Sequence, residues 1–262
     1  MYSAEAVADL LQSQTEVQPK YEALMLHYSQ RNYRTSRSRE FATQGFTRRL
    51  MTLKRCIENV FRALPPDFNG IPEKEALEDG EISLQAFLFN VFGCLDNLAW
   101  IWVEEKHLTR QDGQPLPNNW VGLGQKYTTV RASFTQAFRE YLGTRDDWFS
   151  HLENYRNALA HRIPPYIPPY CVDPANQGRY QELNALILQD ALTGDSVSKE
   201  QHQAEQDSLK FFRPYMGHSF EEDAPIGIVH QQMLIDFLTI EEFAWKMREQ
   251  LDQLNPSSAI PT

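Results

Sequence analysis

The sequence predicts an all-α protein built mainly as an antiparallel helical bundle. Apolar residues recur at three- and four-residue spacing through most of the 262-residue chain, and this is the period of an amphipathic helix. Hydrophobic residues make up 42% of the chain and aromatic residues 12%, which is enough to form a substantial core. The formal net charge of -10 argues against general polyanion binding, so any contact with nucleic acid must be local.

Residues 1–64 are predicted to form an N-terminal helical extension. The first helix covers residues 4–28, with Pro19 as a potential break because proline removes a helical hydrogen bond. The second covers residues 39–64, where seven apolar residues share one face and Pro65 follows the last of them.

Basic residues are concentrated in one part of this extension. Nine arginine and lysine residues fall between Arg31 and Arg62, and only Glu40 and Glu58 oppose them. Two interpretations stay open. The residues form either a solvated helix face or a local patch that contacts phosphate.

Residues 65–82 are rich in proline, glycine and acidic residues, which predicts a linker loop. The helix that follows, over residues 83–107, has a broad apolar stripe and is therefore expected to be buried on more than one side. It is long enough to span a bilayer. One charge, Asp96, and three side-chain amides within it make that costly, so we predict a buried bundle helix and no membrane partner.

The bundle is predicted to occupy residues 83–255, with an insertion over residues 163–229. Paired prolines at residues 164–165 and 168–169 hold the start of this insertion extended, as a strap across the bundle. Its remaining segments are a helix over 178–192, a polar stretch over 193–207 and a segment over 211–229 that could form a short β-hairpin.

The other predicted segments follow from helical spacing and from glycine and proline positions. They are a loop over 111–121, helices over 127–142, 146–162 and 230–254, and a loose tail over 256–262.

The three cysteines, Cys56, Cys94 and Cys171, are far apart in sequence, and no CxxC pair occurs. This spacing does not support a zinc site, and the histidines show no metal-ligand spacing either. We therefore predict no metal and no cofactor, and we interpret the cysteines as reduced core residues of a cytoplasmic protein.

One short segment, from Arg156 to His161, carries the functional hypothesis. Pro164 should end its helix near Ile163, which places His161 in the last turn, where the helix dipole favours imidazolium. A histidine that exchanges protons near neutral pH suits acid–base chemistry. Arg156 and His161 diverge by roughly 140° on an ideal helix, whereas Asn157 and His161 share a face. A site using both Arg156 and His161 would need a neighbouring helix or a second subunit.

A helical bundle with Arg-Asn-x3-His near the end of a late core helix resembles the HEPN domains (higher eukaryotes and prokaryotes nucleotide-binding). Many members of that family are metal-independent endoribonucleases that act as homodimers, and others are non-catalytic nucleotide-binding or protein-interaction modules. The resemblance implies that Arg156 holds the scissile phosphate, that His161 acts as general acid–base for attack by the ribose 2′-hydroxyl, and that Asn157 positions either. RNA or a nucleotide would be the partner.

Two other pairs, Arg145 with His151 and Arg213 with His218, fit a similar loose pattern, so the helical context singles out Arg156 and His161. Asp96 is a charge within an apolar helix and should have a partner. It could orient Arg156 in a functional site, or form a structural ion pair without chemistry. The Arg156–His161 segment itself could serve only as a helix end with polar bundle contacts.

Overall fold

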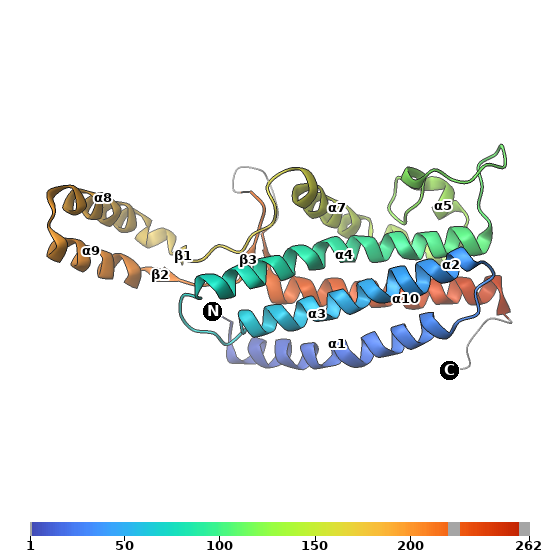
Figure 1. The fold of residues 1–262 in the computed structure, drawn as a ribbon, viewed down its shortest axis with the longest axis horizontal. Coiled ribbons are helices and arrows are strands. Elements are labelled where there is room, and N and C mark those ends of the chain that lie inside the picture. Colours follow the sequence, from blue (N-terminus) through green and yellow to red (C-terminus); the bar gives the residue numbers. More distant parts are fainter. Residues whose placement is uncertain (1, 220–225, 257–262) are drawn as a thin grey trace.

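Four long helices lie side by side and form the body of the protein in a computed structural model, which describes residues 2–219 and 226–256 (Figure 1). They are α1 (Ala4–Gln30), α3 (Thr47–Ala63), α4 (Lys74–Lys106) and α10 (Val229–Leu254). Their apolar faces enclose the main core, in which the largest buried side chains include Tyr28, Phe46, Phe87, Phe237 and Phe243. The prediction of a mainly helical protein is confirmed.

Contacts along the helices give their directions. Helices α3 and α4 are antiparallel, because Gly80 near the start of α4 lies against Leu64 at the end of α3. Helix α10 runs parallel to α1: the Tyr2 hydroxyl is 3.2 Å from Nδ1 of His230 at one end, and Arg31 pairs with Asp252 at the other. Residues 1–64, predicted as an extension, therefore supply two of the four central helices.

The predicted linker over 65–82 is wrong in its second half, because α4 begins at Lys74. Gly80, which suggested a loop, is a packing residue. A Cβ atom there would lie 2.8 Å from Cδ1 of Leu64, so glycine lets the two helices approach.

Helix α1 continues through Pro19 without a break. The residue is exposed, so water can solvate the carbonyl that the missing N–H leaves unpaired.

The helix predicted over 39–64 begins earlier and contains an irregular turn. Helix α2 (Ser36–Glu40) passes into a π-helical segment (Phe41–Phe46), which continues into α3. Gly45 lies within this π segment against the side chain of Asn97. Such turns often occur at functional sites.

The segment that packs beside α4 contains a 3-10 turn (Asn118–Trp120) and three helices, α5 (Thr128–Ala132), α6 (Gln136–Gly143) and α7 (Asp146–His161). The single helix predicted over 127–142 is wrong, because the chain leaves helical geometry before Thr135. The Thr135 hydroxyl then accepts from the Phe138 amide and caps α6.

The proline-rich strap lies across α4, as predicted. Gln85 donates to the Pro165 carbonyl at 3.0 Å, and Glu81 accepts from the Ile167 amide at 2.8 Å. The predicted hairpin is present as β3 (Tyr215–Met216) paired antiparallel with β4 (Gly227–Ile228).

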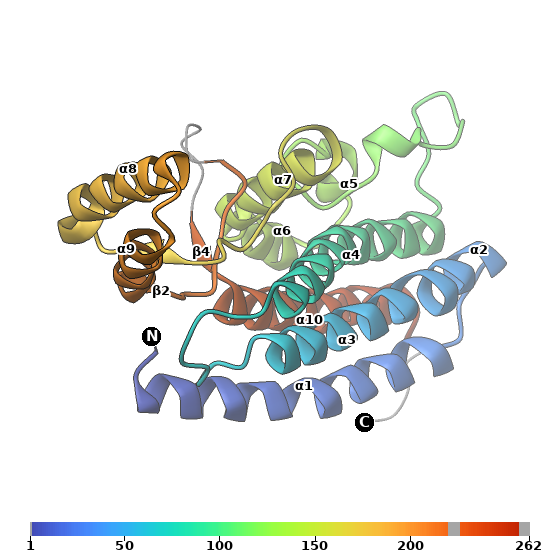
Figure 2. The ribbon, with the colours of Figure 1, turned by 60° about the vertical axis from the view of Figure 1, so that its left-hand side comes forward.

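A two-helix arm extends from this strap, away from the bundle (Figures 1 and 2). A ribbon of β1 (Cys171–Val172) and β2 (Lys210–Phe211) leads to a 3-10 turn (Pro174–Asn176) and helices α8 (Gln177–Thr193) and α9 (Ser196–Ser208). The polar stretch predicted over 193–207 forms most of helix α9.

Among the described residues, α4 alone is long and apolar enough to cross a membrane, and 67% of its most apolar window is buried within the protein. The predicted tail over 256–262 lies almost wholly outside the described residues. Cys56 and Cys94 are buried free thiols, and Cys171 is a half-buried one.

Candidate functional site

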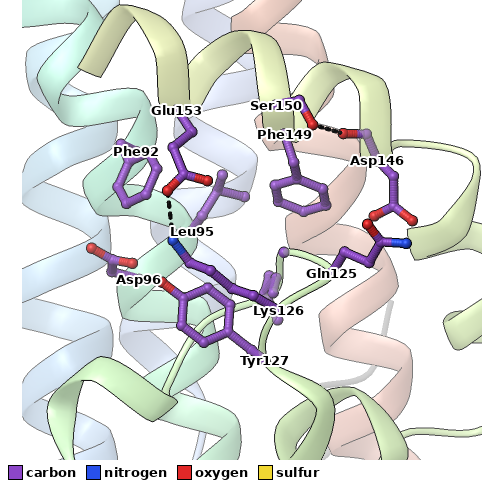
Figure 3. Close-up of a pocket in the computed structure, with 12 residues that line it drawn as sticks. Phe92, Leu95, Asp96, Gln125, Lys126, Tyr127, Asp146, Phe149, Ser150 and Glu153 are labelled. Atoms are coloured by element: carbon purple, nitrogen blue, oxygen red, sulfur yellow. Dashed lines mark hydrogen bonds and ion pairs between the residues drawn. The ribbon is translucent and has the colours of Figure 1, made fainter. Parts of the chain in front are cut away.

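A cavity of about 600 Å³ opens between α4, α7, α2 and the segment over residues 118–127, and we call it the α4–α7 groove. Its wall consists of Arg37, Phe41, Phe92, Asp96, Trp100, Asn118, Asn119, Val121, Lys126, Tyr127 and Arg156. A second cavity of about 170 Å³, shown in Figure 3, adjoins it and shares Phe92, Asp96, Lys126 and Tyr127. The groove has the size of a small-molecule site.

Flat aromatic rings form one side of the groove. The Phe41 and Trp100 rings are stacked, with centroids 5.4 Å apart and planes 10° apart. The Arg37 guanidinium lies over the Phe41 ring, 4.4 Å from its centroid. Phe41 begins the π-helical segment, so the irregular turn is part of the wall of the groove.

Arg156 projects from α7 toward α4. Its Cζ atom is 4.8 Å from the centroid of the Phe92 ring, a distance typical of a cation–π contact. Within the described part of the chain, its guanidinium has no hydrogen bond and no ion pair closer than 4 Å. Its five N–H donors are therefore available to a ligand.

The other two cations of the groove are paired. Arg37 binds Glu40 at 2.8 Å, and both side chains are exposed. Lys126 binds Glu153 of α7 at 2.5 Å, and Figure 3 marks this pair among the residues that line the smaller cavity. Arg156 is thus the groove cation best placed to meet an anion.

Asp96 faces the groove from α4 and has no hydrogen-bond or ion-pair partner among the residues the structure describes. Burial raises the pKa of its carboxyl to about 6, while the charges of Arg156, Arg49 and Lys126 act in the opposite direction. Asp96 and Arg156 therefore line one cavity without forming a direct ion pair.

Arg49 reaches this region from beneath. Its side chain crosses directly over Gly93, whose missing Cβ atom leaves the space. There it donates to Asn90 at 3.0 Å and to Asn97 at 3.1 Å. These bonds fix a half-buried positive charge near Asp96 without neutralising it.

Asn157 and His161 do not line the groove. Asn157 is half-buried, and His161 is exposed in the last turn of α7. As the helical spacing predicts, Arg156 and His161 point to different sides, so one chain does not bring them together. Arg156 and Asp96 therefore line the same groove, whereas Asn157 and His161 lie outside it.

The two other Arg–His pairs have structural surroundings. His151 is half-buried against the Tyr155 ring at 4.9 Å, and His218 is buried against the same ring at 5.4 Å. Burial lowers the pKa of His151, which favours its neutral form. Among the described residues, no group of three or more metal-ligating side chains occurs.

Sequence reasoning missed most of the groove, including its aromatic wall and its amides. Arg37 is the exception in part, because it belongs to the basic stretch for which phosphate contact was one interpretation. The stretch is not one patch: Arg37 lines the groove, Arg49 is held beneath α4, and Arg55 pairs with Glu58 on the surface.

The chain was also compared with known proteins. No protein-family model, no curated protein and no solved structure matches it.

Proposed function

We propose that the α4–α7 groove binds a nucleotide, and that the protein is a non-catalytic, HEPN-like nucleotide-binding bundle. The observation that carries this proposal is the unpaired guanidinium of Arg156 beside stacked aromatic rings in a cavity of about 600 Å³. Arginine binds phosphate in a bidentate manner, and aromatic rings stack on bases. A nucleotide supplies both chemical features.

Isothermal titration with nucleoside monophosphates tests this function. Arg156→Ala should weaken binding about 10-fold or more, because it removes a charge-assisted contact. Arg55→Ala is the matched control, since Arg55 is an exposed arginine on α3 whose side chain is 62% accessible. Absence of binding by the parent protein, or equal binding by both variants, would contradict the proposal.

Metal-independent RNA cleavage in a homodimer is the second candidate. It is favoured by His161, which is exposed to solvent in the last turn of α7. In this mechanism Arg156 holds phosphate, Asn157 positions it, and His161 transfers protons. Because one chain separates Arg156 from His161, a second chain would have to complete the site.

RNA cleavage in EDTA separates the two candidates. A nuclease should lose activity in both Arg156→Ala and His161→Ala, and it should elute as a dimer in light-scattering chromatography. A binding module should not cut RNA, and His161→Ala should leave its nucleotide affinity unchanged.

A further inference from the structure

Asp96 gives the groove a feature that phosphate binding does not explain. A carboxylate repels an anion, yet Asp96 lines the same cavity as Arg156. Partly buried carboxylates normally accept hydrogen bonds, and this one has no partner in residues 2–219 and 226–256. The ligand that fits such a site carries N–H donors at one place and negative charge at another.

The aromatic wall adds a third requirement. Phe41 and Trp100 form a stacked pair, and Tyr127 and Phe92 line the same cavity. Aromatic rings can stack on a flat heterocycle, and here Phe41, Tyr127 and Phe92 already carry Arg37, Lys126 and Arg156 over one face, so a bound base would use the faces that these cations leave free. The side-chain amides of Asn118 and Asn119 supply further donors and acceptors at the wall. A planar base whose edge presents N–H groups satisfies the carboxylate and the rings together.

We propose that the α4–α7 groove is selective for guanine nucleotides, with Asp96 accepting hydrogen bonds from N1–H and the 2-amino group of guanine. This inference rests on the nucleotide-binding function proposed above. Guanine is the common base that presents two adjacent donors on its Watson–Crick edge. Adenine and cytosine pair a donor with an acceptor there, and uracil flanks one donor with two acceptors. An ionised carboxylate therefore gains two charge-assisted bonds from guanine alone.

The two opposite charges of the groove contact different parts of the nucleotide. Asp96 meets the base, and the unpaired guanidinium of Arg156 meets the phosphate. Lys126 is paired with Glu153, and Arg37 is paired with Glu40. Neither cation forms an ion pair with Asp96, so the Asp96 carboxylate stays open to a ligand. The groove thus combines base recognition and phosphate recognition on neighbouring helices.

Selectivity should depend on the protonation of Asp96. Its pKa is raised to about 6 by burial, so the ionised form prevails at pH 7.5. The charged side chains near it are the cations Arg156 on α7, Arg49 on α3, Lys126 and Arg37, and the carboxylates Asp146 and Glu153 that line the adjoining cavity. Below pH 6 the neutral carboxyl donates to adenine N1 and accepts from its amino group. The ratio of GMP to AMP affinity should therefore fall, and the ratio cancels the titration of the phosphate itself.

Titration calorimetry of the full chain with GMP, IMP, XMP and AMP at pH 7.5 tests the proposal. The parent protein should bind GMP about 10- to 100-fold more tightly than AMP. IMP lacks the 2-amino group and should lie between them.

The Asp96→Asn variant provides the sharper measurement. The new amide can donate to O2 of xanthine, where the carboxylate would repel it, so preference should shift from GMP to XMP. Asp236→Asn is the matched control, because Asp236 is a buried carboxylate on α10 outside the groove, and its variant should keep the preference for GMP. Circular dichroism checks that both variants fold.

The outcomes distinguish guanine selectivity from the nucleotide-binding function on which it rests. If all four nucleotides bind equally and Arg156→Ala weakens them all, nucleotide binding stands and guanine selectivity is overturned. If no nucleotide binds, both are overturned. If Asp96→Asn leaves the order of affinities GMP, IMP, AMP unchanged, Asp96 does not recognise the base.

Discussion

Two carboxylates in this protein have the same pKa direction and opposite surroundings. Burial raises the pKa of both Asp96 on α4 and Asp236 on α10 to about 6. Oδ1 of Asp236 accepts from Trp148 Nε1 and Gln232 Nε2, each at 2.8 Å, and the residue is 2% exposed. Asp96 lines a cavity and has no such donors among the described residues.

The difference shows that a raised pKa alone does not identify a functional carboxylate. Asp236 is a structural residue that joins α10 to α7 through the indole of Trp148. The unused acceptors of Asp96 face open space, so a ligand can supply the missing donors. What distinguishes the two is the hydrogen-bond partners and the cavity.

The largest expected effect is the loss of stability when Asp236 is replaced. Asp236→Ala leaves the half-buried Trp148 N–H and the Gln232 amide without their acceptor and empties part of the core, so the free energy of unfolding should fall by about 1–3 kcal/mol. Urea denaturation at pH 7 measures this loss. Asp96→Ala serves as the comparison and should change stability by less than about 1 kcal/mol, because it breaks no hydrogen bond. Equal losses would remove the distinction between the two residues.

The pH dependence of stability should come next in size. Asp236 has a higher pKa folded than unfolded, so the folded state binds more protons between pH 3.8 and about 6. The contribution of Asp236 to the unfolding free energy should therefore rise as pH falls from 7 to 5. Burial lowers the pKa of His27 and His230 to about 4, and both act in the opposite direction.

Comparison with Asp236→Asn isolates the contribution of the carboxylate, because the histidine terms cancel. The variant should be more stable than the parent at pH 7 by on the order of 1 kcal/mol, and the gap should narrow by pH 5. Denaturation at the two pH values measures the gap. A gap that widens on acidification would mean that Asp236 is stabilised as an anion.

A smaller effect is expected near Asp96, where the surrounding charges are more exposed. Glu153→Gln breaks the ion pair with Lys126. The Lys126 side chain is 56% accessible and the Glu153 side chain is 40% accessible. Exposed pairs contribute about 0–1 kcal/mol, so the melting temperature should change little. Differential scanning calorimetry tests this expectation. A loss above about 2 kcal/mol would show that the pair is structural, like the contacts of Asp236.

Several helices were predicted almost to the residue, including α10, whose apolar face is buried, and α8, which buries only Leu183. The stripes of α4 and α10 reflect packing on several sides, and their cores were predicted closely. Helix α9 was missed because it is polar: its one buried residue is Gln206, and it pairs mainly with α8. The early start of α4 was hidden by Gly80, whose role is close helix packing.

The candidate site was predictable only in part, for a similar reason. Arg156 and Asp96 each stood out locally, one in a motif and the other as a charge in an apolar helix. Their meeting with Phe41 and Trp100 depends on a π-helical turn and on tertiary packing, which sequence spacing does not encode. The motif also grouped Arg156 with His161, although helical geometry turns the two side chains apart.

The smallest and most selective effect concerns the charge that Arg156 exerts across the groove. Arg156 is the strongest of the three cations that lower the pKa of Asp96, so Arg156→Met should raise that pKa further, by less than about one unit. Carboxyl ¹³C chemical shifts in aspartate-labelled protein report the titration of each residue. The pKa of Asp236 should stay unchanged, because its shift arises from burial and from hydrogen bonds to Trp148 and Gln232. If both carboxyls shifted together, Arg156 would be acting through the packing of α7, and the groove could not be treated as an independent electrostatic site.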